Sequence, residues 1–183
     1  MNTTVDREKW LRRSLEVLQE EGIQGVRVER LARDLGITKG SFYWHFSDRD
    51  DLKQSILEFW SIKYNDVILE DPEFVESDSE DGLLEVVNRV RAEGLDKYEL
   101  AMRAWADHDT EAARVVQSVY ERRRSFVRSF FTRLGFRGPD AEARSRLALC
   151  YLSWEPNMYL TESEAYQNKV VRHALRLLVS RQH

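Results

Sequence analysis

Apolar residues recur at three- and four-residue steps through almost all of the 183-residue chain, which is the spacing of one face of an α-helix. In the first such run Trp10, Leu11, Leu15 and Leu18 share a side, and Gly22 supplies a C-terminal cap. No alternating run of β-branched residues, the pattern of a half-buried strand, interrupts the helical spacing. The sequence therefore predicts an all-α fold with about nine helices.

The N-terminal helices are short and closely connected. They are expected over Asp6–Glu21, Val28–Leu35 and Thr38–Phe46, with a fourth capped by Ser47 or Asp48. Tight connections of this kind fit a helix-turn-helix unit, whose second helix enters the major groove of DNA. Residues 70–82 are acidic and are expected to form a loop. We therefore predict a helix-turn-helix DNA-binding domain in residues 1–53 and a larger helical domain in residues 54–183.

The composition of the chain is compatible with a helical DNA-binding protein. The formal net charge is −4, but the acids gather in the centre of the chain and leave room for a local basic face elsewhere. The single cysteine, Cys150, cannot form an internal disulfide. Neither a signal peptide nor a run of about 18 apolar residues is visible. We expect a cytoplasmic protein that does not enter a membrane.

The segment GITKGSFYWHFSDRDDL places three aromatic rings and a histidine at positions 42–46. Phe42 and Phe46 stand one helical turn apart and are assigned to the core. The other side chains offer hydroxyl, amine and ring N–H donors to a polyanion, with Trp44 at the rim, and Gly40 allows close approach of the backbone. The predicted DNA-binding residues are Arg27, Thr38, Lys39, Gly40, Ser41, Tyr43, Trp44, His45 and Arg49.

This segment resembles the signature of the tetracycline-repressor (TetR) family of bacterial transcription regulators. The resemblance rests on Gly36, Thr38, Lys39, Gly40, Tyr43, His45, Phe46 and Leu52. One departure is Arg27, where the family often has a capping threonine. The resemblance implies a dimer that binds a double-stranded DNA operator, and a C-terminal part that holds a small-molecule inducer, with no cofactor.

The C-terminal half supports a dimer independently. The last helix carries a broad apolar stripe, which with one side of the preceding helix predicts a homodimer through the last two helices. This surface comprises Val170, Val171, Ala174, Leu177 and Leu178, with Leu147, Cys150, Tyr151 and Trp154. Pro156 bends the preceding helix and can open an inducer pocket. The predicted ligand-binding residues are Trp105, Arg123, Phe126, Tyr151, Trp154, Glu155, Met158 and Tyr159.

Other interpretations remain open at this point. The run Asp107–His108–Asp109 can bind a metal, although a loop in which Asp109 or Thr110 caps a long helix is favoured over a metal site. Cys150 can be a redox sensor, although a buried structural thiol is favoured. No arrangement of catalytic residues supports an enzyme. We predict a ligand-responsive transcription repressor; the alternative is a helical small-molecule-binding or scaffold protein whose DNA-binding unit is vestigial.

Overall fold

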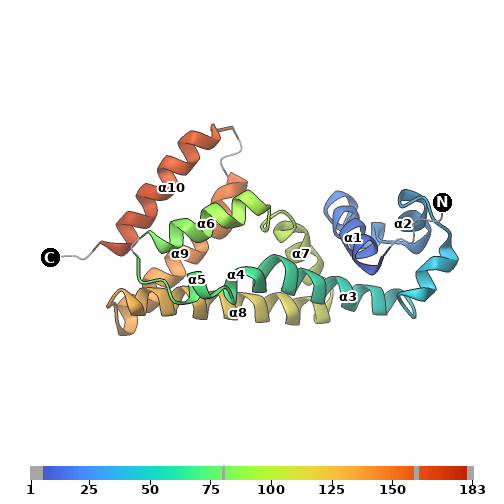
Figure 1. The fold of residues 1–183 in the computed structure, drawn as a ribbon, viewed down its shortest axis with the longest axis horizontal. Coiled ribbons are helices and arrows are strands. Elements are labelled where there is room, and N and C mark those ends of the chain that lie inside the picture. Colours follow the sequence, from blue (N-terminus) through green and yellow to red (C-terminus); the bar gives the residue numbers. More distant parts are fainter. Residues whose placement is uncertain (1–5, 80, 159–160, 181–183) are drawn as a thin grey trace. The chain divides into compact units, whose positions relative to one another are not determined.

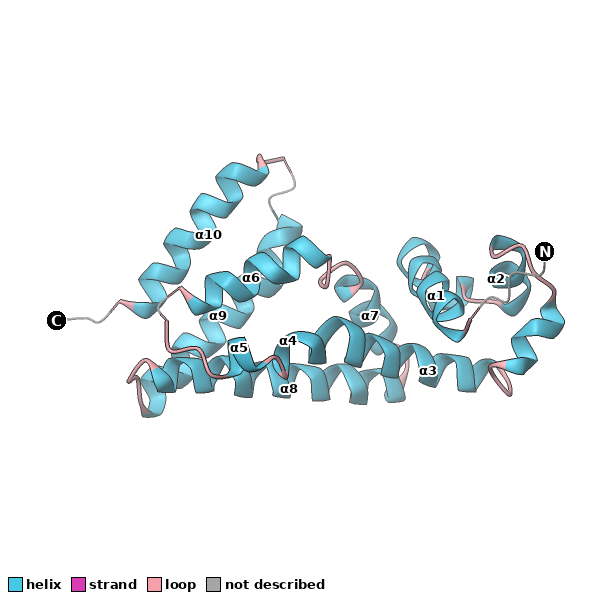
Figure 2. Cartoon of the chain, in the orientation of Figure 1, coloured by secondary structure: helices cyan, strands magenta, loops and turns pink. Residues whose placement is uncertain are grey.

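The computed structural model describes residues 6–79, 81–158 and 161–180, and these residues form helices and connecting turns without a strand (Figures 1 and 2). Ten α-helices lie in these ranges, which confirms the all-α prediction. Two of them, α4 (Val67–Leu69) and α5 (Pro72–Val75), are single turns that the apolar spacing did not indicate. No helix in the described ranges has an apolar stretch sufficient to cross a bilayer.

The chain divides into two compact units. The first contains the described residues of 1–65 together with 95–119, and the second contains those of 66–94 and 120–183. This division differs from the predicted boundary at residue 53, because α3 (Arg49–Ser61) continues past that point and buries Ile56 and Trp60. The assignment of a DNA-binding domain to residues 1–53 and an inducer domain to 54–183 stays a prediction.

The first unit is built around α1 (Arg7–Glu21). Asp6 caps this helix by accepting a hydrogen bond from the backbone N–H of Lys9 at 2.9 Å, and Gly22 ends it with φ of 73°. Trp10, Leu15 and Leu18 are fully buried, as the apolar spacing predicted. The other elements of this unit are η1 (Ile23–Gly25), α2 (Val28–Asp34), η2 (Lys39–Trp44), α3, α7 (Glu99–Ala106) and the start of α8 (Thr110–Arg133).

The second unit contains α6 (Gly82–Glu93), the rest of α8, α9 (Gly138–Met158) and α10 (Glu164–Val179). Its core joins all four of these helices. The buried members are Leu83, Leu84, Val87, Val127, Phe130, Phe131, Phe136, Ala141, Ala148, Val171, Leu175 and Val179. Arg91 of α6 also donates a hydrogen bond to the side chain of Asn168 in α10 at 2.6 Å.

The acidic segment is more ordered than the predicted loop over residues 70–82. Asp71 caps α5 by accepting from the N–H of Glu73, and Phe74 is buried. The Nε of Arg133 donates to the carbonyl oxygen of Ser77 at 2.7 Å and holds the segment against α8. The prediction of a plain loop was wrong because a single aromatic anchor and one arginine are enough to fix a short segment that is otherwise polar.

The thiol of Cys150 is exposed, so the prediction of a buried structural cysteine was wrong. The reason lies in the register of α9. Ala141, Ser145 and Ala148 follow steps of four and three residues and face the core of the second unit. Cys150 lies two residues beyond Ala148, and therefore on the opposite side of the helix.

Candidate nucleic-acid interface

Residues 38–46 divide into an inner and an outer set of side chains. Phe42 and Phe46 are buried, with ring centroids 5.2 Å apart, and Phe42 meets Trp10 of α1 edge to face at 5.5 Å. Tyr43 is 68% exposed and Trp44 is 86% exposed. The expected split between core rings and outward rings is therefore present. Trp44 was predicted at the rim, but its ring lies largely in solvent.

The element itself differs from the prediction. Lys39–Trp44 forms a 3₁₀-helix rather than an α-helix over Thr38–Phe46. The N–H of Ser41 bonds to the carbonyl oxygen of Thr38 at 3.1 Å, and the Ser41 hydroxyl donates to the same oxygen at 2.8 Å. The hydroxyl of Thr38 makes no capping bond to η2. The N–H of Phe46 bonds to the carbonyl oxygen of Phe42 at 3.0 Å, and this α-helical turn after η2 keeps both rings on the core side.

Gly40 is not required by the chain's own packing. Its φ is not positive, and a Cβ at this position would meet only the hydroxyl oxygen of Thr38, at 3.7 Å. An ordinary side chain would therefore fit. Glycine here leaves the backbone of an exposed 3₁₀-helix uncovered, which suits close approach by another molecule.

A turn joins this segment firmly to α3. Asp48 caps α3 by accepting from the N–H groups of Asp50 and Asp51, at 2.9 and 2.8 Å. Asp51 in turn accepts from the N–H of Ser47 at 2.8 Å, and this bond holds the pKa of the Asp51 carboxyl below its usual value. Of the two caps expected for this helix, the structure uses Asp48.

Two of the predicted DNA contacts are arginines bound to the chain itself. The guanidinium of Arg49 donates to the carbonyl oxygens of Val26 at 3.3 Å and Ile23 at 3.1 Å. Arg27 precedes α2 without capping it, as expected for arginine, and its Nε donates to the carbonyl oxygen of Gln24 at 3.2 Å. Both side chains tie down the turn around η1. Their DNA contacts stay predictions.

Ion pairs fix α2 against α1. Arg13 of α1 lies 2.8 Å from the carboxylate of Asp34, and Arg30 of α2 lies 2.9 Å from that of Glu20. The hydrogen bond from Arg13 is the main reason why the pKa of Asp34 is lowered. Because Leu31 is also buried, two sides of α2 contact other parts of the first unit and are not available to a partner.

The free side of α2 carries an acid that the sequence analysis missed. The carboxylate of Glu29 lies 2.5 Å from the Nζ of Lys39, the first residue of η2, and both side chains are more than half exposed. This ion pair lowers the pKa of Glu29. A spacing of ten residues across a turn gives no periodic signal, so only the fold brings the two groups together.

The last two helices expose apolar side chains. On α10, Val171, Leu175 and Val179 are buried in the second unit, whereas Val170 and Leu177 are exposed, Leu177 to 62%. On α9, Leu147 and Cys150 are exposed. The broad stripe seen in the sequence therefore consists of two faces, one of which is left uncovered.

The described residues of the predicted inducer set are divided between the two units. Trp105 is buried in the first unit, while Phe126 and Tyr151 pack on the core of the second. The guanidinium of Arg123 lies over the ring of Tyr120, 5.6 Å from its centroid. The side chains of Trp154, Glu155 and Met158, and the whole of Tyr159, lie outside what the structure describes. The ligand set stays a prediction.

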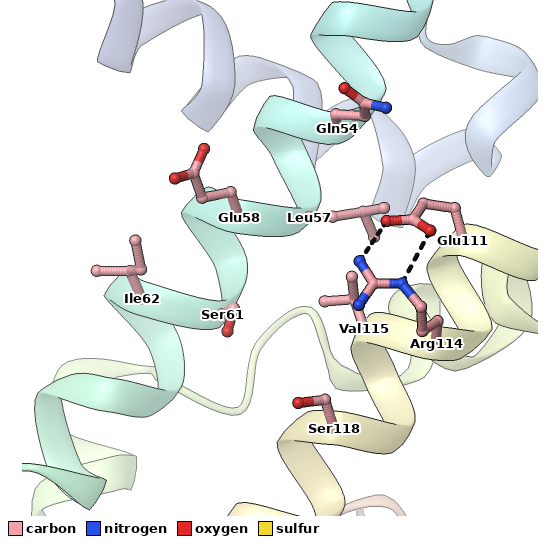
Figure 3. A pocket seen from close by; sticks show the side chains of 9 residues that line it. All are labelled: Gln54, Leu57, Glu58, Ser61, Ile62, Glu111, Arg114, Val115 and Ser118. Carbon is pink, nitrogen blue, oxygen red and sulfur yellow. Dashed lines mark hydrogen bonds and ion pairs between the residues drawn. The ribbon is translucent and has the colours of Figure 1, made fainter.

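A groove of about 450 Å³ lies between α3 and α8 within the first unit (Figure 3). Its walls include short side chains, Ser61 and Ser118, which leave the space between the helices unfilled. Glu111 is held by Arg114 in two hydrogen bonds of 3.0 and 2.6 Å. The lining residues are Gln54, Leu57, Glu58, Ser61, Ile62, Glu111, Arg114, Val115 and Ser118, and none of them belongs to the predicted ligand set.

Asp109 is the cap of α8, as the favoured interpretation of Asp107–His108–Asp109 predicted. Its carboxylate accepts from the N–H groups of Glu111 and Ala112, both at 3.1 Å. The bond from Ala112 lowers the pKa of Asp109. Among the described side chains, no cluster of three or more metal-binding groups occurs.

The arrangement of α1, α2 and η2 is that of a helix-turn-helix domain with an exposed second helix. Residues 11–56 match the family of bacterial regulatory proteins, tetR family. The tetracycline repressor protein class C of Escherichia coli is 35% identical over 54 residues, which are 30% of this chain and 25% of that protein. The chain thus spans about a quarter of the length of the curated relatives it matches.

Similarity in fold extends further than similarity in sequence. A transcriptional regulator from Rhodococcus sp. Rha1 superposes with a TM-score of 0.73 at 19% identity, over 96% of this chain and 94% of that chain. A putative TetR-family regulator from Mesorhizobium loti gives 0.72 at 21% identity, over 94% of each chain. The N-terminal residues 11–56 thus resemble the tetR family of regulators, and the whole described chain shares the fold of these structures.

Proposed function

We propose that the protein is a dimeric transcription repressor that binds a palindromic DNA operator and is released by a small-molecule inducer. The observation that carries the proposal is the division of residues 38–46, in which Phe42 and Phe46 build the core while Tyr43 and Trp44 project into solvent. Adjacent exposed rings rimmed by a polar group such as Lys39 are typical of an interaction surface. Such a repressor works beside the DNA, in the cytoplasm.

The exposed faces of α9 and α10 support the dimer. Leu147 and Leu177 form no part of the second unit's core, and two copies paired through them would bury both. A two-fold pair presents two copies of η2, spaced by about one DNA turn of roughly 34 Å, to successive major grooves. The name of the related tetracycline repressor supports repression as the mode of action.

Salt dependence separates this proposal from a scaffold protein with a vestigial DNA-binding unit. Binding through phosphates releases counterions, so affinity for duplex DNA is expected to fall steeply between about 50 and 200 mM salt. Lys39→Ala should reduce the slope of log K against log salt concentration by about one per subunit, because one cation is lost from each. A mobility-shift or anisotropy titration measures this. Binding that is absent or insensitive to salt contradicts the proposal.

We place the inducer in the groove between α3 and α8. α3 follows directly from η2 through the Asp48 turn, so a molecule held against α3 acts on the element that positions the DNA-binding segment. The carboxylate of Glu58 is exposed, whereas Glu111 is neutralised by Arg114. With Leu57 and Val115 beside it, the groove suits an apolar molecule that carries one positive charge.

A matched pair of probes tests the groove. We expect 2-naphthylmethylammonium to raise the unfolding temperature of the protein, whereas 2-naphthalenesulfonate, of similar shape and opposite charge, should not. Ser118→Trp fills the groove and should abolish the effect of the ammonium compound. Equal responses to the two probes, or a response that survives in the tryptophan variant, would exclude the groove as the site.

A further inference from the structure

Glu29 lies at the end of η2 that faces the bases in a helix-turn-helix complex. In such complexes the N-terminal residues of the second helix contact base edges. Lys39 is the first residue of η2, and its Nζ lies 2.5 Å from the Glu29 carboxylate. Because Leu31 and Arg30 commit the other sides of α2 to the first unit, Glu29 projects from the side that faces η2.

A carboxylate at this position can bind only some groups of the DNA. It is repelled by phosphates and accepts hydrogen bonds only, so it needs a donor on the DNA. In the major groove, guanine presents two acceptors, thymine an acceptor and a methyl group, and adenine an acceptor beside its amino group. Cytosine presents only the N4 amino donor. Among the four bases, cytosine is therefore the one that a carboxylate meets without repulsion.

Lys39 makes the approach possible. Its ammonium group has three N–H donors, so it can keep its bond to Glu29 while it contacts a phosphate or a base acceptor. The ammonium group of Lys39 offsets the negative charge of the carboxylate and lowers the pKa of Glu29. The pair thus brings an acid to DNA with its charge largely compensated.

We infer that Glu29 is a sequence-selecting residue of the DNA-binding surface, whose carboxylate, held by Lys39, accepts a hydrogen bond from the N4 amino group of a cytosine in each half-site. The inference rests on the proposed function and goes beyond it, because it assigns a base to Glu29, a residue outside the predicted DNA-binding set. Lys39 contributes affinity, and Glu29 contributes discrimination.

The test begins with selection of bound fragments from random duplex DNA by the wild-type protein and by Glu29→Gln. Glutamine pairs with the N6 and N7 atoms of adenine. The wild-type selection should fix a cytosine at one position of each half-site, and the variant should select adenine there or lose its preference, with all other positions unchanged. Glu8→Gln is the matched control, because Glu8 is an exposed acid paired with Arg12 at 2.6 Å on α1. Its selected motif should equal that of the wild type.

A second measurement uses the operator selected by the wild-type protein. Replacing the assigned cytosine by thymine should weaken wild-type binding by about 10-fold or more. The same replacement should change the binding of Glu29→Gln by less than about 3-fold. If the wild-type protein selects no DNA, the proposed function itself fails. If it selects a motif but the variant shows the same base preferences and the same loss on replacement, the inference about Glu29 alone is overturned.

Discussion

Replacing Phe42 by alanine is expected to lower the free energy of unfolding by about 3–5 kcal/mol, the usual cost of removing a buried phenylalanine ring. The ring is 1% exposed and contacts both Trp10 and Phe46. It therefore joins α1 to the segment that precedes α3. A cavity at this junction removes the contacts of the ring with Trp10 and Phe46.

Urea or thermal unfolding followed by circular dichroism measures the loss. Tyr43→Ala is the control, because Tyr43 adjoins Phe42 in the chain but is largely exposed. This change should cost less than about 1 kcal/mol of stability while weakening DNA binding strongly. The two variants thus separate the core role from the binding role of neighbouring rings. Equal stability losses in both would contradict the division of the segment into an inner and an outer side.

Most of the fold could be predicted because local signals agree with it. Asp6, Asp48 and Asp109 cap the helices that follow them, and glycines end α1 and α8. Capping and apolar spacing act over a few residues and can be read directly from a sequence. The structure departs from the prediction where a residue far along the chain fixes a segment. The acidic segment, which Arg133 holds against α8, is an example.

The candidate site could be predicted only in part. The outward position of Tyr43 and the inward position of Phe42 follow from their spacing within one turn of helix. The 3₁₀ geometry of η2 does not, because it depends on the bonds between Ser41 and Thr38. Glu29 could not be found from the pattern, since its ion pair with Lys39 depends on the angle between two helices. The groove likewise depends on how closely α3 and α8 approach.

Replacing Leu177 by aspartate is expected to convert the dimer to monomers and to lower operator affinity by about 100-fold or more. Leu177 lies on the uncovered face of α10, so the substitution leaves the core formed by Val171, Leu175 and Val179 intact. A charge at the centre of an apolar two-fold contact is desolvated twice without a partner, once in each subunit. In a dimer, binding of one subunit raises the effective concentration of the other at the second half-site, which increases affinity by a factor of roughly 10²–10⁴. Separate subunits lose this increase.

Leu100 offers the matched control for this experiment. It is a leucine of α7 in the first unit and is 46% exposed, but it lies on no helix assigned to the dimer. Sedimentation and a titration of a palindromic operator should show a monomer with weak binding for Leu177→Asp, and an unchanged dimer for Leu100→Asp. A dimer that persists in the Leu177 variant would move the two-fold contact away from α10. Because the spacing of the two copies of η2 depends on that contact, the expected distance between half-sites would then have to be derived from another pair of helices.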